Sequence, residues 1–95
     1  MRTIEKNLIA AVKAGKRYNV ANTTFDPVCG VVSLHGNPIA KINGGAMLCS
    51  LAGWNTPTTR SRINALANTF GHPGVSTKKG QAFSGGHPVD VRAWF

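Results

Sequence analysis

The residues best suited to chemistry lie in "TPTTRSRIN", residues 56–64, which the pattern predicts to begin a helix. A helix N-terminus presents free N–H groups and a positive dipole end, so it favours acidic side chains and disfavours basic ones. These residues include no acid and two arginines. A bound phosphate would offset that unfavourable charge. The candidate anion site comprises Thr58, Thr59, Arg60 and Arg62.

The two arginines are not expected to form one patch on the helix surface. With Ile63 facing inward, helical geometry places Arg60 about 60° to one side of the apolar stripe and Arg62 about 100° to the other. They would then flank the open helix end, where hydroxyl and N–H groups already favour an anion. The alternative is that their aliphatic stems cover the edges of a sheet while their charged heads stay in water.

The charge balance of the chain is strongly positive. Eleven Lys and Arg residues face three Asp and Glu residues, which gives a formal net charge of +8. Such a surface attracts nucleic acid, an anionic membrane or an acidic protein. Further phosphate contacts are expected from Lys16 and Arg17 after the first predicted helix, and from Lys78 and Lys79 at a predicted hairpin tip. The alternative for these pairs is a solvated basic surface.

Two aromatic residues are further candidates for contact with nucleic acid. Tyr18 and Trp54 can stack on nucleic-acid bases, because stacking tolerates any base. The alternative reading of Trp54, which follows a predicted strand, is a lid over the core. We favour the lid over the stacking role from the sequence alone.

Few residues are suited to catalysis or metal binding. Three scattered acids make a general acid–base pair improbable. Cys29 and Cys49 are not part of a Cys-x-x-Cys motif, and the three histidines have no metal-ligand spacing. We expect Cys49 to be a small core residue, although its pairing with a histidine in space stays open. The protein is therefore predicted to be no enzyme and to bind no metal or cofactor.

Two segments predict helices, residues 3–14 and 57–70, each followed by a glycine of the kind that ends helices. The second helix has two candidate N-cap residues, Thr56 with Pro57 following it, or Thr58. Apolar residues recur at helical spacing in both segments. The inward-facing positions are expected to be Ile4, Leu8, Ala11 and Val12 in the first helix and Thr59, Ile63, Leu66, Ala67 and Phe70 in the second.

The segment between the helices predicts antiparallel strands. Residues 16–25 are rich in β-branched and aromatic residues and are expected to form one strand. The next three apolar runs are separated by turn signals at Gly36–Pro38 and Asn43–Gly45. We expect His35 to pair with Ile39 across a three-residue loop, and the second turn to use Asn43-Gly44 or Gly44-Gly45. One inner face would then contain Val32, Leu34, Ala40, Ile42, Met47, Cys49 and Leu51.

The remainder of the chain completes the predicted fold. Residues 75–83 predict a hairpin, and residues 85–95 predict a C-terminal strand or an arm that packs on another chain. We expect a single α+β domain over residues 1–95, with an antiparallel sheet of about four to six strands and two helices on one face. The expected order is α-β-β-β-β-α-β-β. No apolar run reaches the roughly 20 residues of a membrane span, and no signal peptide is evident, so no membrane contact is expected.

Three segments, "LHGNPIAKI", "AGWNTPTTRSRINAL" and "VSTKKGQ", resemble a family of small uncharacterised proteins of tailed bacteriophages. The resemblance runs from about residue 22 to about residue 83, with the segments in the same order and at similar spacing. Relatives end soon after the last strand, whereas this chain adds "SGGHPVDVRAWF". The resemblance implies a phage product in the cytoplasm of an infected bacterium and brings no activity. The matching residues are His35, Gly36, Asn37, Ile39, Ala40, Ile42, Gly53, Trp54, Thr58, Thr59, Ser61, Arg62, Asn64, Ala65 and Leu66.

The function best suited to these observations is a non-enzymatic accessory protein that binds DNA or RNA through the phosphate backbone. Such binding is salt-sensitive and largely independent of sequence. One alternative is a host-takeover or anti-defence inhibitor that binds an acidic host protein or a small nucleotide. The other is a minor virion component, for which self-assembly into a homo-oligomer would be the sign.

Overall fold

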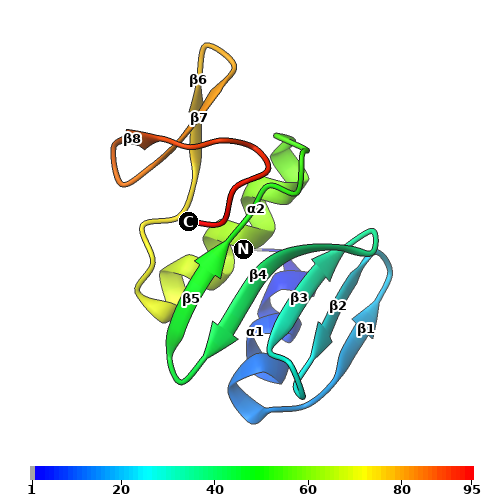
Figure 1. Ribbon diagram of the computed structural model, residues 1–95. Helices are drawn as coiled ribbons and strands as arrows, with labels where there is room; N and C mark the ends of the chain where they lie inside the picture. Colours follow the sequence, from blue (N-terminus) through cyan, green and yellow to red (C-terminus); the bar gives the residue numbers. More distant parts are fainter. Residues whose placement is uncertain (1) are drawn as a thin grey trace.

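The computed structural model describes residues 2–95. A five-stranded antiparallel sheet, two helices and a separate three-stranded sheet make up the fold (Figure 1). The elements are α1 (Thr3–Ala14), β1 (Tyr18–Val20), β2 (Thr23–Asp26), β3 (Val31–Leu34), β4 (Asn37–Asn43), β5 (Ala46–Cys49), α2 (Pro57–Phe70), β6 (Ser76–Lys78), β7 (Gln81–Ser84) and β8 (His87–Pro88).

The large sheet is a meander in which strands adjacent in sequence are adjacent in space, in the order β1-β2-β3-β4-β5. Both helices lie behind this sheet in Figure 1, with α1 against β1 and β2 and α2 against β4 and β5, so among residues 2–95 no helix covers the other face of the sheet. The predicted α+β fold with two helices on one face is therefore confirmed. The strands after α2 form their own sheet, in the order β6-β7-β8.

The prediction of one strand over residues 16–25 is wrong, because the chain turns at Ala21 and Asn22 and forms two strands, β1 and β2. Ala21 has a φ of 53°. Residues other than glycine, asparagine and aspartate are uncommon in this left-handed region. Ala21 itself therefore gives no ordinary turn signal.

The predicted pairing of His35 with Ile39 is also wrong. Leu34 pairs with Asn37 across a two-residue turn, in which His35 and Gly36 have φ of 52° and 79°. A register shift beyond the turn, at Val32 and Ser33, then makes Ile39 the extra residue of a bulge. Ile39 is consequently buried beside Ala40 instead of facing outward with His35. The following turn uses Gly44-Gly45, one of the two predicted options.

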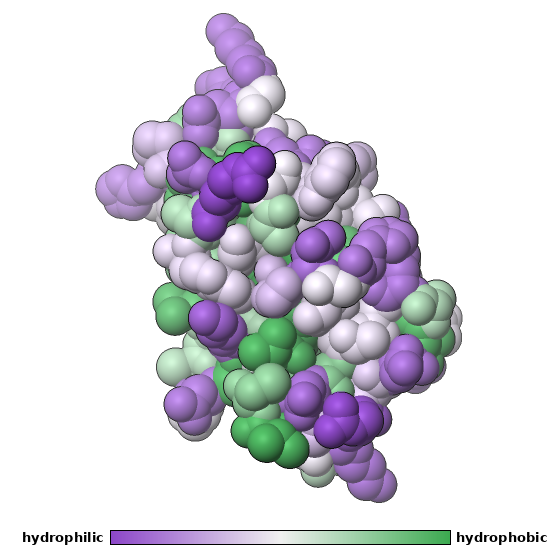
Figure 2. Space-filling view, turned by 45° about the vertical axis from the view of Figure 1, so that its right-hand side comes forward, coloured by the Kyte–Doolittle hydropathy of each residue, from purple (hydrophilic) through white to green (hydrophobic). Residues whose placement is uncertain are grey.

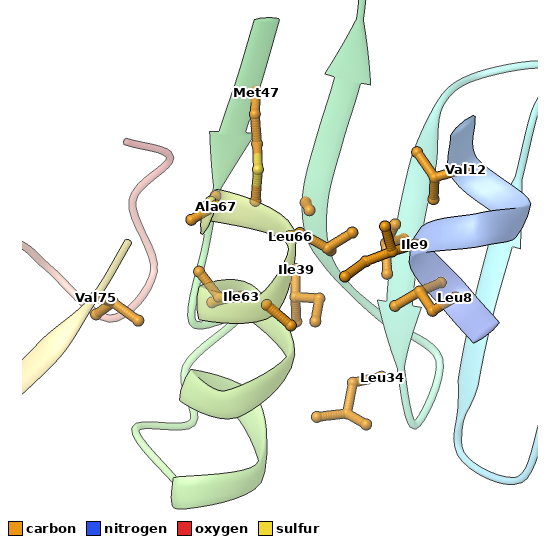
Figure 3. Packing of buried hydrophobic residues seen from close by; sticks show 14 of the residues in the cluster. Leu8, Ile9, Val12, Leu34, Ile39, Met47, Ile63, Leu66, Ala67 and Val75 are labelled. Atoms are coloured by element: carbon orange, nitrogen blue, oxygen red, sulfur yellow. The ribbon is translucent and has the colours of Figure 1, made fainter. Parts of the chain in front are cut away.

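The core lies between the helices and the covered face of the large sheet. Figure 3 shows Leu8, Ile9 and Val12 of α1 directed toward the strands and Leu66. Burial of each large aliphatic side chain contributes about 1.5–3 kcal/mol to stability. The predicted inner face of the sheet is buried, with Ile42 only partly so. The buried face of α1 is Glu5, Leu8, Ile9 and Val12, so a carboxylate occupies a core position that the sequence analysis did not identify.

The C-terminal tail packs on its own chain. Phe95 exchanges two backbone hydrogen bonds with Cys49 of β5, with N···O distances of 2.7 and 2.8 Å. The Gly53 N–H donates to the Val91 carbonyl over 2.7 Å. His72 accepts the Gly74 N–H at Nδ1, which leaves Nε2 to donate to the Phe95 carbonyl over 3.1 Å. The tail thereby covers the edge of β5, where an additional strand would otherwise pair.

Candidate nucleic-acid interface

The first turn of α2 uses its own residues to satisfy most of its N–H groups. Thr56 is the N-cap, and its Oγ1 accepts the Thr59 N–H over 3.2 Å. Pro57 has no N–H, and the Arg60 N–H donates to the Thr56 carbonyl over 3.0 Å. Among residues 2–95, this leaves the Thr58 N–H as the donor of this turn without an acceptor. The helix end therefore has fewer free N–H donors for an anion than the sequence analysis expected.

Arg62 is buried inside the protein and cannot flank an exposed anion site. Its side chain is 5% exposed, and its Nη1 lies 2.7 Å from Oε2 of Glu5. Its Nε donates to Oγ1 of Thr23 over 3.2 Å. Thr59 is also buried, at 2% exposed. The structure thus corrects the predicted site at these two positions, because the negative partner of Arg62 is Glu5 of α1.

The Glu5 carboxylate is held in its charged form by its neighbours. Burial raises its pKa, but hydrogen bonds from Ser61 and Arg62, together with the Arg62 charge, outweigh burial and lower the pKa below its ordinary value. The Ser61 hydroxyl donates to Oε2 over 2.6 Å. Because Glu5, Leu8, Ile9 and Val12 follow helical spacing, a lone acid within an apolar stripe was the signal available in the sequence.

Asn64 also has a structural role, like Ser61 and Arg62 before it in the sequence. Its side chain donates to the Val75 carbonyl over 2.8 Å and accepts the Val75 N–H over 2.7 Å. These two bonds imitate strand pairing and fix the chain as it leaves the helix for β6. Ser61, Arg62 and Asn64 therefore hold α2 against α1 and against the segment before β6.

Arg60 lies in a different environment from the buried Arg62, at the end of the molecule where α2 begins. Its Nη1 donates to the carbonyl of Asn55 over 3.1 Å and also to the Asn55 side-chain oxygen. Asn55 in turn donates to Oγ1 of Thr77 over 3.2 Å. Thr77 precedes Lys78 in β6, so the network joins Arg60 to the hairpin that carries the two predicted lysines.

Arg92 of the tail reaches the same region. A methyl group placed on Gly53 would lie 3.7 Å from the Arg92 guanidinium carbon, and Gly53 precedes Trp54. The sequence analysis did not identify Arg92, since only the returning tail brings it here. We define the basic end as Arg60, Lys78, Lys79 and Arg92, of which all but the half-buried Arg60 are exposed.

The predicted contacts Lys16 and Arg17 are not part of the basic end. They lie on the α1–β1 connection, at the opposite end of the molecule from the β6–β7 tip (Figure 1). Arg17 also lies 3.5 Å from Asp26, in an exposed pair of small energetic value. Figure 2 shows hydrophilic side chains at both the upper and lower ends of the face it displays. The predicted basic residues therefore form two separate groups.

A cavity of about 430 Å³ opens between the β3–β4 turn and the start of α2. Leu34, Ile39 and Leu51 form its apolar interior, and Trp54 forms part of its wall. Trp54 is 62% exposed, so it does not close the core as a lid, and that prediction is corrected.

Tyr18 is half-buried, and its hydroxyl donates to the Ile4 carbonyl over 3.2 Å. Tyr18 is thereby held in the fold.

Cys49 and His72 are neighbours in space, with 3.9 Å between Sγ and Nδ1. Burial raises the pKa of the Cys49 thiol to about 12, so the thiol stays protonated at neutral pH. Among residues 2–95 no group of three or more His, Cys, Asp or Glu side chains could hold a metal ion. None of the helices described in this part of the chain is long and apolar enough to cross a membrane.

The architecture defines a small α+β protein with a basic end beside an apolar cavity. The whole chain, residues 1–95, matches the family described as Kyanoviridae Gp96 protein, and it belongs to this family of bacteriophage proteins. The phage origin that the resemblance implied is thus confirmed, and the family match extends through the tail. No curated protein and no solved structure matches the chain.

Proposed function

We propose that this phage protein is a non-enzymatic accessory protein that binds DNA or RNA through the phosphate backbone, mainly with its basic end. The observation that carries the proposal is that Arg60, Arg92 and the β6–β7 hairpin with its two lysines all contact the short segment 53–55, which includes the exposed Trp54. These cations come from α2, the β6–β7 hairpin and the tail, which only the tertiary fold brings together. Phosphate contacts of this kind orient a protein on nucleic acid without reading its sequence.

The surface charge supports this proposal. Glu5 and Arg62 neutralise each other in the interior, so the formal net charge of +8 resides on the other ionisable side chains. Asp90 is the acid nearest the basic end in sequence, and its carboxylate accepts the backbone N–H of Arg92 over 2.8 Å. Four phosphate contacts on a single strand would give a log–log salt dependence with a slope of about −3.

The non-enzymatic part of the proposal rests on the chemistry of the available groups. The carboxylate of Glu5 is buried in an ion pair, and the Cys49 thiol is buried and protonated. Neither group meets the requirement that a catalytic acid, base or nucleophile reach its substrate. A phage product that binds nucleic acid would act in the cytoplasm of the infected bacterium.

Fluorescence anisotropy with labelled single- and double-stranded DNA and RNA, at low and high salt, tests this function. K78A/K79A removes two charges from the basic end, and K16A/R17A removes two from the opposite end as a charge-matched control. We expect the first variant to lose about tenfold or more in affinity and the control clearly less. Absence of binding to every polymer at low salt would overturn the proposal.

An acidic host protein is the second candidate partner. The uncovered sheet face supports it, because Leu48 is 51% exposed there and Trp94 is 38% exposed. Trp94 packs over Lys41, with Nζ 4.2 Å from the ring centroid. Exposed apolar and aromatic side chains beside a cation suit a protein interface. Capture of a protein from host lysate that persists at high salt, with no nucleic-acid binding, would favour this partner.

A further inference from the structure

The cavity at the start of α2 combines an apolar interior with a polar rim. Ile39 and Leu51 are almost completely buried at its base. His35, Asn37 and Thr58 stand around it and provide hydrogen-bond donors and acceptors. A volume of about 430 Å³ lies in the range of pockets that enclose small organic ligands. The cavity therefore suits a flat, largely apolar group with polar edges.

Trp54 indicates which group of this kind fits best. Its ring is 62% exposed beside the cavity, so the fold leaves a large aromatic surface in water. Arg60 binds Asn55, the residue after Trp54, and Arg92 lies against Gly53, the residue before it. An exposed aromatic ring whose two neighbours in sequence both contact arginines suits a nucleotide, whose base stacks while its phosphates meet the charges.

We propose that the cavity receives one unpaired base of a single-stranded nucleic acid, stacked against Trp54, while the neighbouring phosphates contact Arg60 and Arg92. This inference rests on the proposed function and names its substrate as a single strand. A duplex cannot use the cavity, because its bases are already stacked and paired inside the helix. The polar rim formed by His35, Asn37 and Thr58 then contacts the edges of the base.

The two tryptophans of the chain allow a direct test. W94F leaves Trp54 as the only tryptophan, and W54F leaves only Trp94, which lies on the uncovered sheet face. On titration with oligo(dT), we expect strong quenching of tryptophan emission in W94F and little change in W54F. A duplex of equal length should leave the emission of W94F nearly unchanged. Equal quenching of both variants would overturn the inference.

Affinity measurements separate stacking from charge. W54A is expected to lose about tenfold in affinity for oligo(dT), whereas W54F retains most of it because a smaller aromatic ring remains. An abasic oligonucleotide of the same length and charge should bind the wild type about tenfold more weakly than oligo(dT). Thermal denaturation should show that W54A is as stable as the wild type, since Trp54 is exposed.

The outcomes distinguish this inference from the proposed function. If oligo(dT) binds in a salt-sensitive manner but W54A and the abasic probe match their controls, the base site is wrong and backbone binding stands. If neither single strands nor duplexes bind at low salt, the proposed function fails, and the base site fails with it. Tight duplex binding that exceeds single-strand binding also overturns the base site.

Discussion

The guanidinium of Arg62 donates to the carboxylate of Glu5 over 2.7 Å, and the pair joins two helices whose contacting residues lie 57 positions apart in sequence. Arg62 is the sixth residue of α2, and its buried charge requires a negative group nearby. Glu5 is that group, and it comes from α1. The interaction accounts for Arg62 without any ligand, and it restricts the candidate interface to the residues around Arg60.

Removal of one partner of this pair should be strongly destabilising. Arg62→Ala leaves Glu5 buried without its cation, which costs about 3–5 kcal/mol of unfolding free energy. The double variant Glu5→Leu/Arg62→Leu removes both charges and should recover much of this loss. Urea denaturation measures both effects, with Arg60→Ala as a control expected to cost about 1 kcal/mol or less. Equal losses in Arg62→Ala and Arg60→Ala would contradict the buried-pair assignment.

Stability should fall in acid because of the lowered pKa of Glu5. A carboxyl whose pKa is lower in the folded state contributes stability that is fully present above its unfolded value of about 4.3. That contribution is lost as the pH falls through the folded pKa, where the folded protein also takes up the proton. Urea midpoints measured from neutral pH down into this range should decline more steeply in the wild type than in Glu5→Gln. Parallel curves would show that Glu5 is not the responsible group.

The tail should protect Cys49 from reaction. Cys29 is exposed and Cys49 is buried, and burial raises the pKa of the Cys49 thiol to about 12. A thiol reagent such as DTNB should therefore react rapidly with Cys29 alone in the native protein and with both thiols in denaturant. Deletion of residues 91–95 removes the Phe95 backbone bonds to Cys49 and should accelerate its reaction. Cys29→Ser provides the control in which only Cys49 reports, and an unchanged rate after deletion would contradict the covering role.

Local sequence signals predicted the features that depend on the conformation of one or two residues. The Gly44-Gly45 turn and the helix ends at Gly15 and Gly71 follow from glycine in left-handed conformations. The turn at Ala21 was missed because alanine rarely adopts such a conformation. The second sheet was not separated from the first in the prediction, because the tail that occupies the β5 edge comes from the end of the chain.

The residues of the candidate site likewise differ in whether a local pattern could identify them. Arg60, Lys78 and Lys79 were identified from their types and their place in a helix start and a hairpin tip. Arg62 was assigned to the surface because periodicity gives its angle on the helix but not what lies opposite, which is Glu5 of α1. Arg92 and the cavity depend on contacts between distant segments, so no local pattern could indicate them.

Gly30 should be the glycine least tolerant of substitution by alanine. Its φ is 71°, and an added Cβ would collide with the backbone carbonyl oxygen of Ile42. The same backbone contact includes a hydrogen bond of 2.8 Å from the Ile42 N–H to the Gly30 carbonyl. Gly36, with a φ of 79° and open space around it, is the matched control. It shares the left-handed conformation but not the collision.

The expected result separates backbone strain from steric overlap. Gly36→Ala should cost about 1–2 kcal/mol of unfolding free energy, the penalty of an L-residue in the left-handed region. Gly30→Ala should cost that amount plus about 1–3 kcal/mol for overpacking against β4. Urea denaturation of both variants measures the difference. Equal losses would mean that the connection between β2 and β3 moves away from Ile42 without penalty, which would contradict the close approach at Gly30.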